Sequence, residues 1–258
     1  ALPILIFAKK RLKNNFLAYA ITFSYLIFFG TQYALTFDFH SATFAAILLP
    51  WLFWLMFEKR WKLFTFFFFL AMGAKEDMPL LLASVALYLV FSKLHKKLGI
   101  VLLVITLGYF FGITKFVMPS MSVLSAIRYD TPIPPHDICG WLVILFDSPI
   151  KLRTMFLSFA SFIFLPLISK WFLIIPLTHF FINFFSQQFN GRWDIFLHYR
   201  VHLASILAFG TILGIQNLLT IKALKKNKTR IPLILGVLLL ISNLILDYKL
   251  HLPLNVLG

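Results

Sequence analysis

The chain has 258 residues, of which 60% are hydrophobic and 13% are charged, and its formal net charge is +15. A soluble domain of this length cannot bury 32 Phe with its other apolar side chains, so the composition excludes a soluble globular protein and indicates a polytopic membrane protein. The excess of Lys and Arg is typical of short cytoplasmic connectors that touch anionic membrane lipid, and we expect no nucleic-acid partner. The single cysteine, Cys139, excludes an internal disulfide and a cysteine-based metal site.

Apolar runs along the chain predict an all-α transmembrane helical bundle of about nine spans, preceded by the end of a truncated span. We expect a single transmembrane domain over residues 1–258. Because residues 1–8 resemble the end of a span already in progress, we also expect an N-terminally truncated fragment. The predicted spans are 15–37, 41–57, 63–74, 78–91, 98–117, 154–169, 171–185, 201–221 and 231–246.

Basic clusters alternate with these spans and predict their orientation, because Lys and Arg beside a span stay on the cytoplasmic side. The clusters lie at 9–13, 58–62, 93–97 and 222–230, and at Lys170. By this map every acidic residue except Glu58 falls at or near the outer face, which predicts an outward-facing acidic site. Two outer segments follow from the same map: a loop over 118–150, with 138–146 lying along the interface, and a second segment over 187–200.

Three consecutive charged residues, Lys75, Glu76 and Asp77, interrupt a long apolar run that has basic clusters on both sides. The run must cross an even number of times, so the three residues form the outer turn of a hairpin. The arm 63–74 reaches about 18 Å as a helix, against a hydrocarbon core of about 30 Å, so the charges lie below the surface. There Lys75 suits a substrate phosphate, and the carboxylates suit a metal ion or a catalytic base. The alternative is a plain turn with a self-neutralising Lys–Glu pair.

Asp38 and His40 flank one residue in a predicted outer turn. In an extended turn this spacing places both side chains on one side. A carboxylate and an imidazole together hold a divalent metal ion or act as an acid–base pair. The alternative is an Asp at a helix start beside an interfacial His.

The sequence His198-Tyr199-Arg200 precedes a span and follows Arg192 and Asp194. Arg and His at the outer face can clamp an anionic group. The alternative is an interfacial belt, where Tyr and Arg are common.

Within the spans, His179 is most simply a packed and hydrogen-bonded core residue. The pairs Gly108/Gly112 and Gly210/Gly214 have the spacing that allows close helix packing.

Several of these motifs, each present once, follow one another in a characteristic order along the chain. They are Asp38-Phe39-His40, Glu58-Lys59-Arg60-Trp61, Lys75-Glu76-Asp77, Met118-Pro119, and His198-Tyr199 before the span that contains Gly210. In this order, over nearly its whole length, the chain resembles the prokaryotic membrane proteins grouped as domain of unknown function 2079. That family is similar to the GT-C class of membrane glycosyltransferases.

The resemblance implies a GT-C-like fold in the prokaryotic plasma membrane and a polyprenyl-phosphate-linked sugar as substrate at the outer face. It gives Asp38, His40, Glu76 and Asp77 catalytic roles, with Asp38 and His40 as ligands of a divalent cation, Mg²⁺ or Mn²⁺. Asp38 and His40 occupy the place of the second acidic motif of that class, although the motif here is Asp-x-His rather than two carboxylates. The first acidic motif of the class would precede Ala1.

The substrate phosphate would lie against basic and aromatic residues of two segments. They are Lys75, His198, Tyr199 and Arg200. A shared site requires Asp38, His40, Glu76 and His198 to line one cavity. The alternatives are a multi-pass transporter or flippase of a lipid-linked or small anionic substrate, and a non-catalytic membrane scaffold. A transporter would place its charges deep between two gates, whereas a transferase would gather them at one face.

Overall fold

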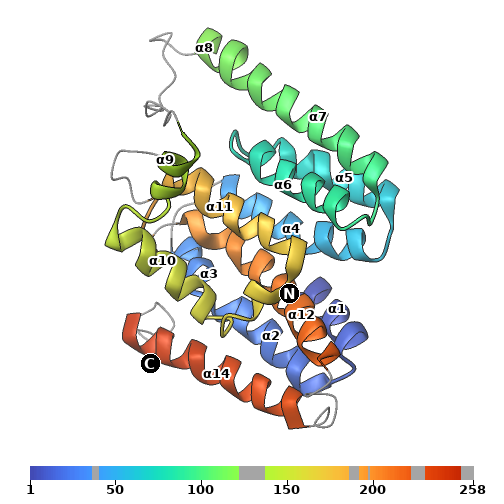
Figure 1. Ribbon diagram of the computed structural model, residues 1–258, viewed down its shortest axis with the longest axis vertical. Helices are drawn as coiled ribbons and strands as arrows, with labels where there is room; N and C mark the ends of the chain where they lie inside the picture. The colour runs from blue at the N-terminus through green and yellow to red at the C-terminus, as the bar shows by residue number, and fades with distance from the viewer. Residues whose placement is uncertain (37–40, 122–136, 186–191, 197, 222–229, 251–258) are drawn as a thin grey trace.

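A computed structural model describes residues 1–36, 41–121, 137–185, 192–196, 198–221 and 230–250 (Figure 1). Within these ranges the regular structure is helical, without a strand. The α-helices are α1 (Leu2–Leu12), α2 (Asn15–Ile27), α3 (Phe29–Leu35), α4 (Ser41–Phe57), α5 (Trp61–Met72), α6 (Met78–Phe91), α7 (Lys96–Gly112), α8 (Met118–Met121), α9 (Ile138–Val143), α10 (Pro149–Ala160), α11 (Ile174–Phe184), α12 (Val201–Thr220) and α14 (Arg230–Leu250). Shorter pieces are a π-helix, Ile113–Val117, and 3₁₀ turns at Leu165–Ile168, Lys170–Leu173 and His198–Arg200.

Among the described helices, three are long and apolar enough to cross a membrane. They are Lys96–Met121, His198–Thr220 and Arg230–Leu250. The last helix, Arg230–Leu250, begins one residue before the predicted span 231–246 and continues four residues beyond it. It therefore includes Asp247.

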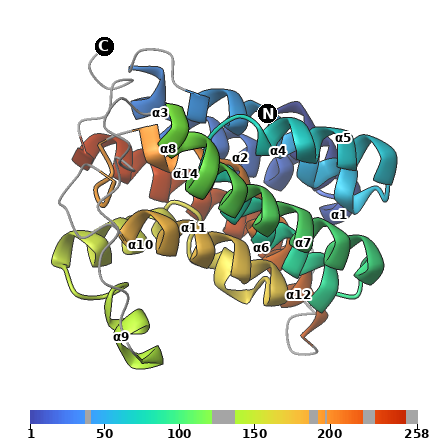
Figure 2. The same cartoon turned by 90° about the horizontal axis from the view of Figure 1, so that it is seen from above.

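Helix α12 lies in the middle of the bundle, with α7 and α14 near opposite edges (Figure 1). Most of α12 is buried, and its Phe209 ring packs 5.1 Å from the ring of Phe7 and 5.4 Å from that of Phe53. Figure 2 shows α9 at the edge of the molecule, where Trp141 stacks on Phe185 of the segment after α11. The phenylalanine-rich composition therefore produces one aromatic core around α12.

Two predicted spans differ from the helices that form. The span 15–37 is broken at Phe28, whose ψ of 131° ends α2 before α3 begins. The predicted bounds 154–169 are wrong. The helix there begins at Pro149, where the Ser148 hydroxyl caps it, and ends at Ala160. The chain then turns through Ile163 and Phe164, which have φ values of 45° and 58°. Such left-handed residues stop a helix, so no continuous helix covers that stretch.

The two glycine pairs behave differently. A Cβ on Gly214 would lie 2.1 Å from the carbonyl oxygen of Leu165, and one on Gly210 would lie 3.1 Å from Pro166. Close packing is thus confirmed for that pair. The prediction of close packing is wrong for Gly108 and Gly112, where an added Cβ would meet nothing within 4 Å.

The predicted cytoplasmic connectors meet at one end of the bundle. Lys10 pairs with Glu58 at 2.5 Å, which joins the end of α1 to the end of α4. Trp61 and His95 pack edge to face, with 4.8 Å between their ring centroids, and join the starts of α5 and α7. Phe91 at the end of α6 stacks on Trp171 beside Lys170. These contacts therefore bring together four of the predicted inner basic clusters, those at 9–13, 58–62 and 93–97 and at Lys170, while residues 222–229 lie outside the described part of the chain.

Candidate functional site

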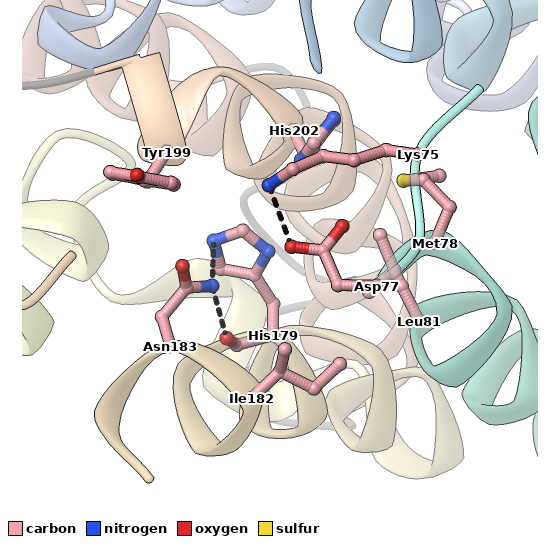
Figure 3. A pocket seen from close by; sticks show the side chains of 9 residues that line it. All are labelled: Lys75, Asp77, Met78, Leu81, His179, Ile182, Asn183, Tyr199 and His202. Carbon is pink, nitrogen blue, oxygen red and sulfur yellow. Dashed lines mark hydrogen bonds and ion pairs between the residues drawn. The ribbon is translucent and has the colours of Figure 1, made fainter. Parts of the chain in front are cut away.

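A small cavity lies where the turn between α5 and α6 meets α11 and the start of α12 (Figure 3). Its lining residues are Lys75, Asp77, Met78, Leu81, His179, Ile182, Asn183, Tyr199 and His202. Its volume of ≈ 10 Å³ is about the space needed for one water molecule. In this conformation the cavity holds polar side chains close together without room for a larger ligand.

Three helix ends and one helix face bring these side chains together. Residues 73–77 form the predicted hairpin turn, since α5 ends at Met72 and α6 begins at Met78. His179 and Asn183 lie four residues apart on α11, so both point from the same face. His202 lies in the first turn of α12, and Tyr199 lies in the 3₁₀ turn just before it.

Lys75 and Asp77 form an ion pair inside this arrangement. The Lys75 Nζ donates to Asp77 Oδ2 at 2.7 Å, and the two side chains are 10% and 22% exposed. The same ammonium lies 5.1 Å from the ring centroid of Tyr199. Figure 3 shows Lys75 and Asp77 pointing toward the ring of His179, with Tyr199 across the cavity. A largely buried pair of this kind is screened by water much less than a surface pair.

The hydrogen bonds of the two histidines fix which ring nitrogen carries a hydrogen. His202 Nε2 lies 3.0 Å from the carbonyl oxygen of Ala42, and a carbonyl only accepts, so this nitrogen is the donor. His179 Nε2 lies 3.5 Å from Arg200 Nη1, and guanidinium only donates, so that nitrogen accepts. The rings are 6.0 Å apart between centroids. When neutral, the two imidazoles are therefore opposite tautomers, fixed by the Ala42 carbonyl on one side and by Arg200 and Asn183 on the other.

Arg200 is fully buried and holds the segment before α12 in place. Its guanidinium donates to the backbone carbonyls of Asp194 and Arg192 and contacts His179. A Cβ on Gly30 of α3 would lie 2.7 Å from Arg200 backbone and Cβ atoms, so this close contact requires glycine. Arg200 thus lies behind the cavity wall and orients His179.

Helix α10 holds the same segment from the other side. Thr154 Oγ1 donates to the carbonyl of Trp193 at 2.7 Å, and Lys151 Nζ lies 4.1 Å from the Trp193 ring centroid. Lys151 is 1% exposed and pairs with Asp147 at 2.8 Å. The loop that carries Tyr199 is therefore tied both to α10 and to α11.

The structure brings together only some of the residues that the sequence singled out. Lys75, Asp77 and Tyr199 line the cavity. Glu76 instead lines a neighbouring groove, which Lys75 also lines. His198 is buried in the 3₁₀ turn and is not a lining residue of this cavity.

Asp38 and His40 lie outside the described residues. Among the residues that are described, no three side chains of His, Cys, Asp and Glu come together in a way that suits a metal ion. The predicted divalent cation and its two predicted ligands therefore stay predictions.

The sequence pattern did not predict roles for Asn183 and His202, and it predicts His179 only as a core residue. His179 is indeed buried and contacts Asn183, but it also lines the cavity. The available signal was the spacing of four residues between His179 and Asn183, which predicts a shared polar face on an otherwise apolar helix. His202 gave the weaker signal of a His one turn into a span.

The chain matches a family of membrane proteins over nearly its whole length. Residues 1–255 match a family model described as "Predicted membrane protein (DUF2079)". Comparisons with curated proteins and with solved structures gave no match.

Proposed function

The chain belongs to the DUF2079 family of predicted membrane proteins, and we propose that it is a GT-C-like glycosyltransferase of the prokaryotic plasma membrane. Its substrate is a sugar linked to a polyprenyl phosphate, bound at the outer face. The observation that carries the proposal is the Lys75–Asp77 pair, which meets His179, His202 and Tyr199 in one cavity. A cation for a phosphate and a carboxylate for a proton are the two groups that this transfer needs.

The proposed reaction moves a sugar from phosphate to an acceptor hydroxyl. The acceptor oxygen forms a bond to the anomeric carbon while the bond from that carbon to the phosphate oxygen breaks. Both electrons of the broken bond stay on the polyprenyl phosphate, and Lys75 stabilises the added negative charge. The hydroxyl proton passes to the Asp77 carboxylate, which acts as general base.

The ion pair links these two roles. With no substrate, Lys75 neutralises Asp77 at 2.7 Å. A phosphate that approaches Lys75 competes with Asp77 for the same ammonium, and the carboxylate then becomes available to accept a proton. Arg192, whose guanidinium lies 5.3 Å from the Tyr199 ring centroid, adds positive charge on the side of the phosphate.

A divalent cation held by Asp38 and His40 would neutralise phosphate charge in the same way as Lys75. The steps above are assigned to Lys75 and Asp77, which are described residues of the cavity. Arg200 acts through His179, as a positioning residue rather than as a phosphate ligand.

The test is turnover of a radiolabelled polyprenyl-phosphate sugar in membranes that supply natural acceptors. Lys75→Met should lose most of this activity, whereas Lys115→Met, which removes an exposed cation outside the cavity, should keep it. Equal activity of the two variants would contradict the proposal. A parent protein that moves labelled lipid between leaflets without transferring sugar would favour the flippase alternative.

A further inference from the structure

An open groove of ≈ 310 Å³ lies beside the cavity, between the α5–α6 turn and the second half of α7. Its walls are mainly apolar, and its charged residues belong to the turn. The lining residues are Met72, Gly73, Lys75, Glu76, Tyr109, Ile113 and Met118. Lys75 lines both spaces, so the groove and the cavity adjoin at this residue.

Helix α7 packs closely against α6 near its start. A Cβ on Gly99 would lie 2.8 Å from the carbonyl oxygen of Ala86 in α6, so the two backbones nearly touch there. Gly108 and Gly112 lie on the opposite face of α7 from Gly99, where an added Cβ would meet nothing within 4 Å. The helix continues toward α8, as Figure 1 shows, and Tyr109 and Ile113 of this part line the groove.

A π-helix interrupts α7 at the groove. It covers Ile113–Val117 and begins with a lining residue, Ile113. Thr114 Oγ1 donates to the carbonyl oxygen of Phe110 at 2.7 Å and accompanies the change in backbone hydrogen bonding. Single π-helical turns within α-helices occur often at functional sites.

The exposed surface of this part of the helix is mainly apolar, although it also carries the exposed Lys115. Phe111 is 56% exposed and Phe116 is 75% exposed, so in a bilayer these rings face lipid chains. The groove therefore has a helix with exposed apolar rings on one side and the charged turn that carries Lys75 on the other. An amphiphile with one apolar chain and an anionic head matches both the apolar lining residues and the cation.

We propose that the groove binds the chain of a single-chain prenyl phosphate, which enters sideways from the membrane and places its phosphate at Lys75. This inference rests on the proposed function and adds where the lipid part of the substrate lies. The chain packs on Met72, Tyr109, Ile113 and Met118.

Gly73→Phe tests the groove by filling it. Gly73 has φ −79°, and a Cβ there meets only backbone oxygens at 3.8 and 3.9 Å, so a larger side chain fits the backbone and projects into the groove. Gly108→Phe is the matched control, because it adds the same ring to open space on α7 outside the groove. The readout is the Kd of tritiated farnesyl phosphate for the purified protein in nanodiscs, with melting temperature measured in parallel.

We expect Gly73→Phe to weaken binding about tenfold or more and Gly108→Phe to leave it within about twofold. If Gly73→Phe binds like the parent while Lys75→Met does not, the phosphate site stands and the groove proposal is overturned. Absence of binding by the parent would overturn both. Displacement of farnesyl phosphate by an equal amount of dioleoyl phosphatidic acid would show that the groove takes two-chain lipids and would contradict the single-chain assignment.

Discussion

The ammonium of Lys75 lies 2.7 Å from the carboxylate of Asp77, and the same lysine lines both the small cavity and the larger groove beside it. Glu76, between them in sequence, lines the groove and not the cavity. One short turn thus presents a carboxylate to each space and a shared cation between them. This division gives Glu76 and Asp77 different roles, which their adjacency in the sequence does not suggest.

The orientation of the chain is testable with thiol labelling. Cys139 is exposed and lies in the predicted outer loop, so the native protein should react with an impermeant maleimide added to intact cells. In a Cys139→Ser background, Ser41→Cys and Ser120→Cys should also react from outside, and Lys97→Cys should react only after permeabilisation; all three positions are exposed. The reason is the positive-inside rule, which places the cluster around Lys97 in the cytoplasm. Labelling of Lys97→Cys in intact cells would contradict the predicted orientation and indicate the opposite one.

Gly30→Ala should loosen the segment before α12. A methyl group there would lie 2.7 Å from Arg200 backbone atoms, and overpacking of this kind typically costs about 1–3 kcal/mol. We expect a lower melting temperature in detergent and reduced turnover, because Arg200 orients His179. Gly108→Ala, which meets no neighbour, is the control. A Gly30→Ala protein that melts with the parent would show that α3 and Arg200 are not in close contact.

Lys151→Met should destabilise the protein although Lys151 does not line the cavity. The change removes the partner of Asp147 and the donor to the carbonyl of Ile144, which lies 2.8 Å away. Loss of a buried hydrogen-bond partner costs about 1–3 kcal/mol. Melting curves should show this loss, whereas Lys170→Met, at an exposed position, should melt within error of the parent. If Lys151→Met and Lys170→Met both had the melting temperature of the parent, Lys151 would have no structural role.

The sequence predicted the hairpin turn, α4 and α12 well, because apolar runs bounded by charged clusters leave few choices for where a membrane helix ends. It could not predict which face of α11 or α12 meets the turn. Helix α12 is apolar nearly all round, so its pattern carries no signal for a polar contact at His202. The early end of α10 also escaped prediction, since left-handed Ile163 and Phe164 are a tertiary effect that neither residue type favours.

The effect of Asp77→Asn on sugar transfer tests most directly whether Asp77 is the general base. This substitution keeps the shape of the side chain and removes the charge proposed to accept the acceptor proton. Turnover of a radiolabelled polyprenyl-phosphate sugar should fall about a hundredfold or more, with expression and melting temperature close to those of the parent. Asp137→Asn is the matched control, because Asp137 is an exposed helix cap outside the cavity and Asn caps a helix as well as Asp. Turnover by a folded Asp77→Asn protein at the level of Asp137→Asn and the parent would contradict the claim that Asp77 is the general base.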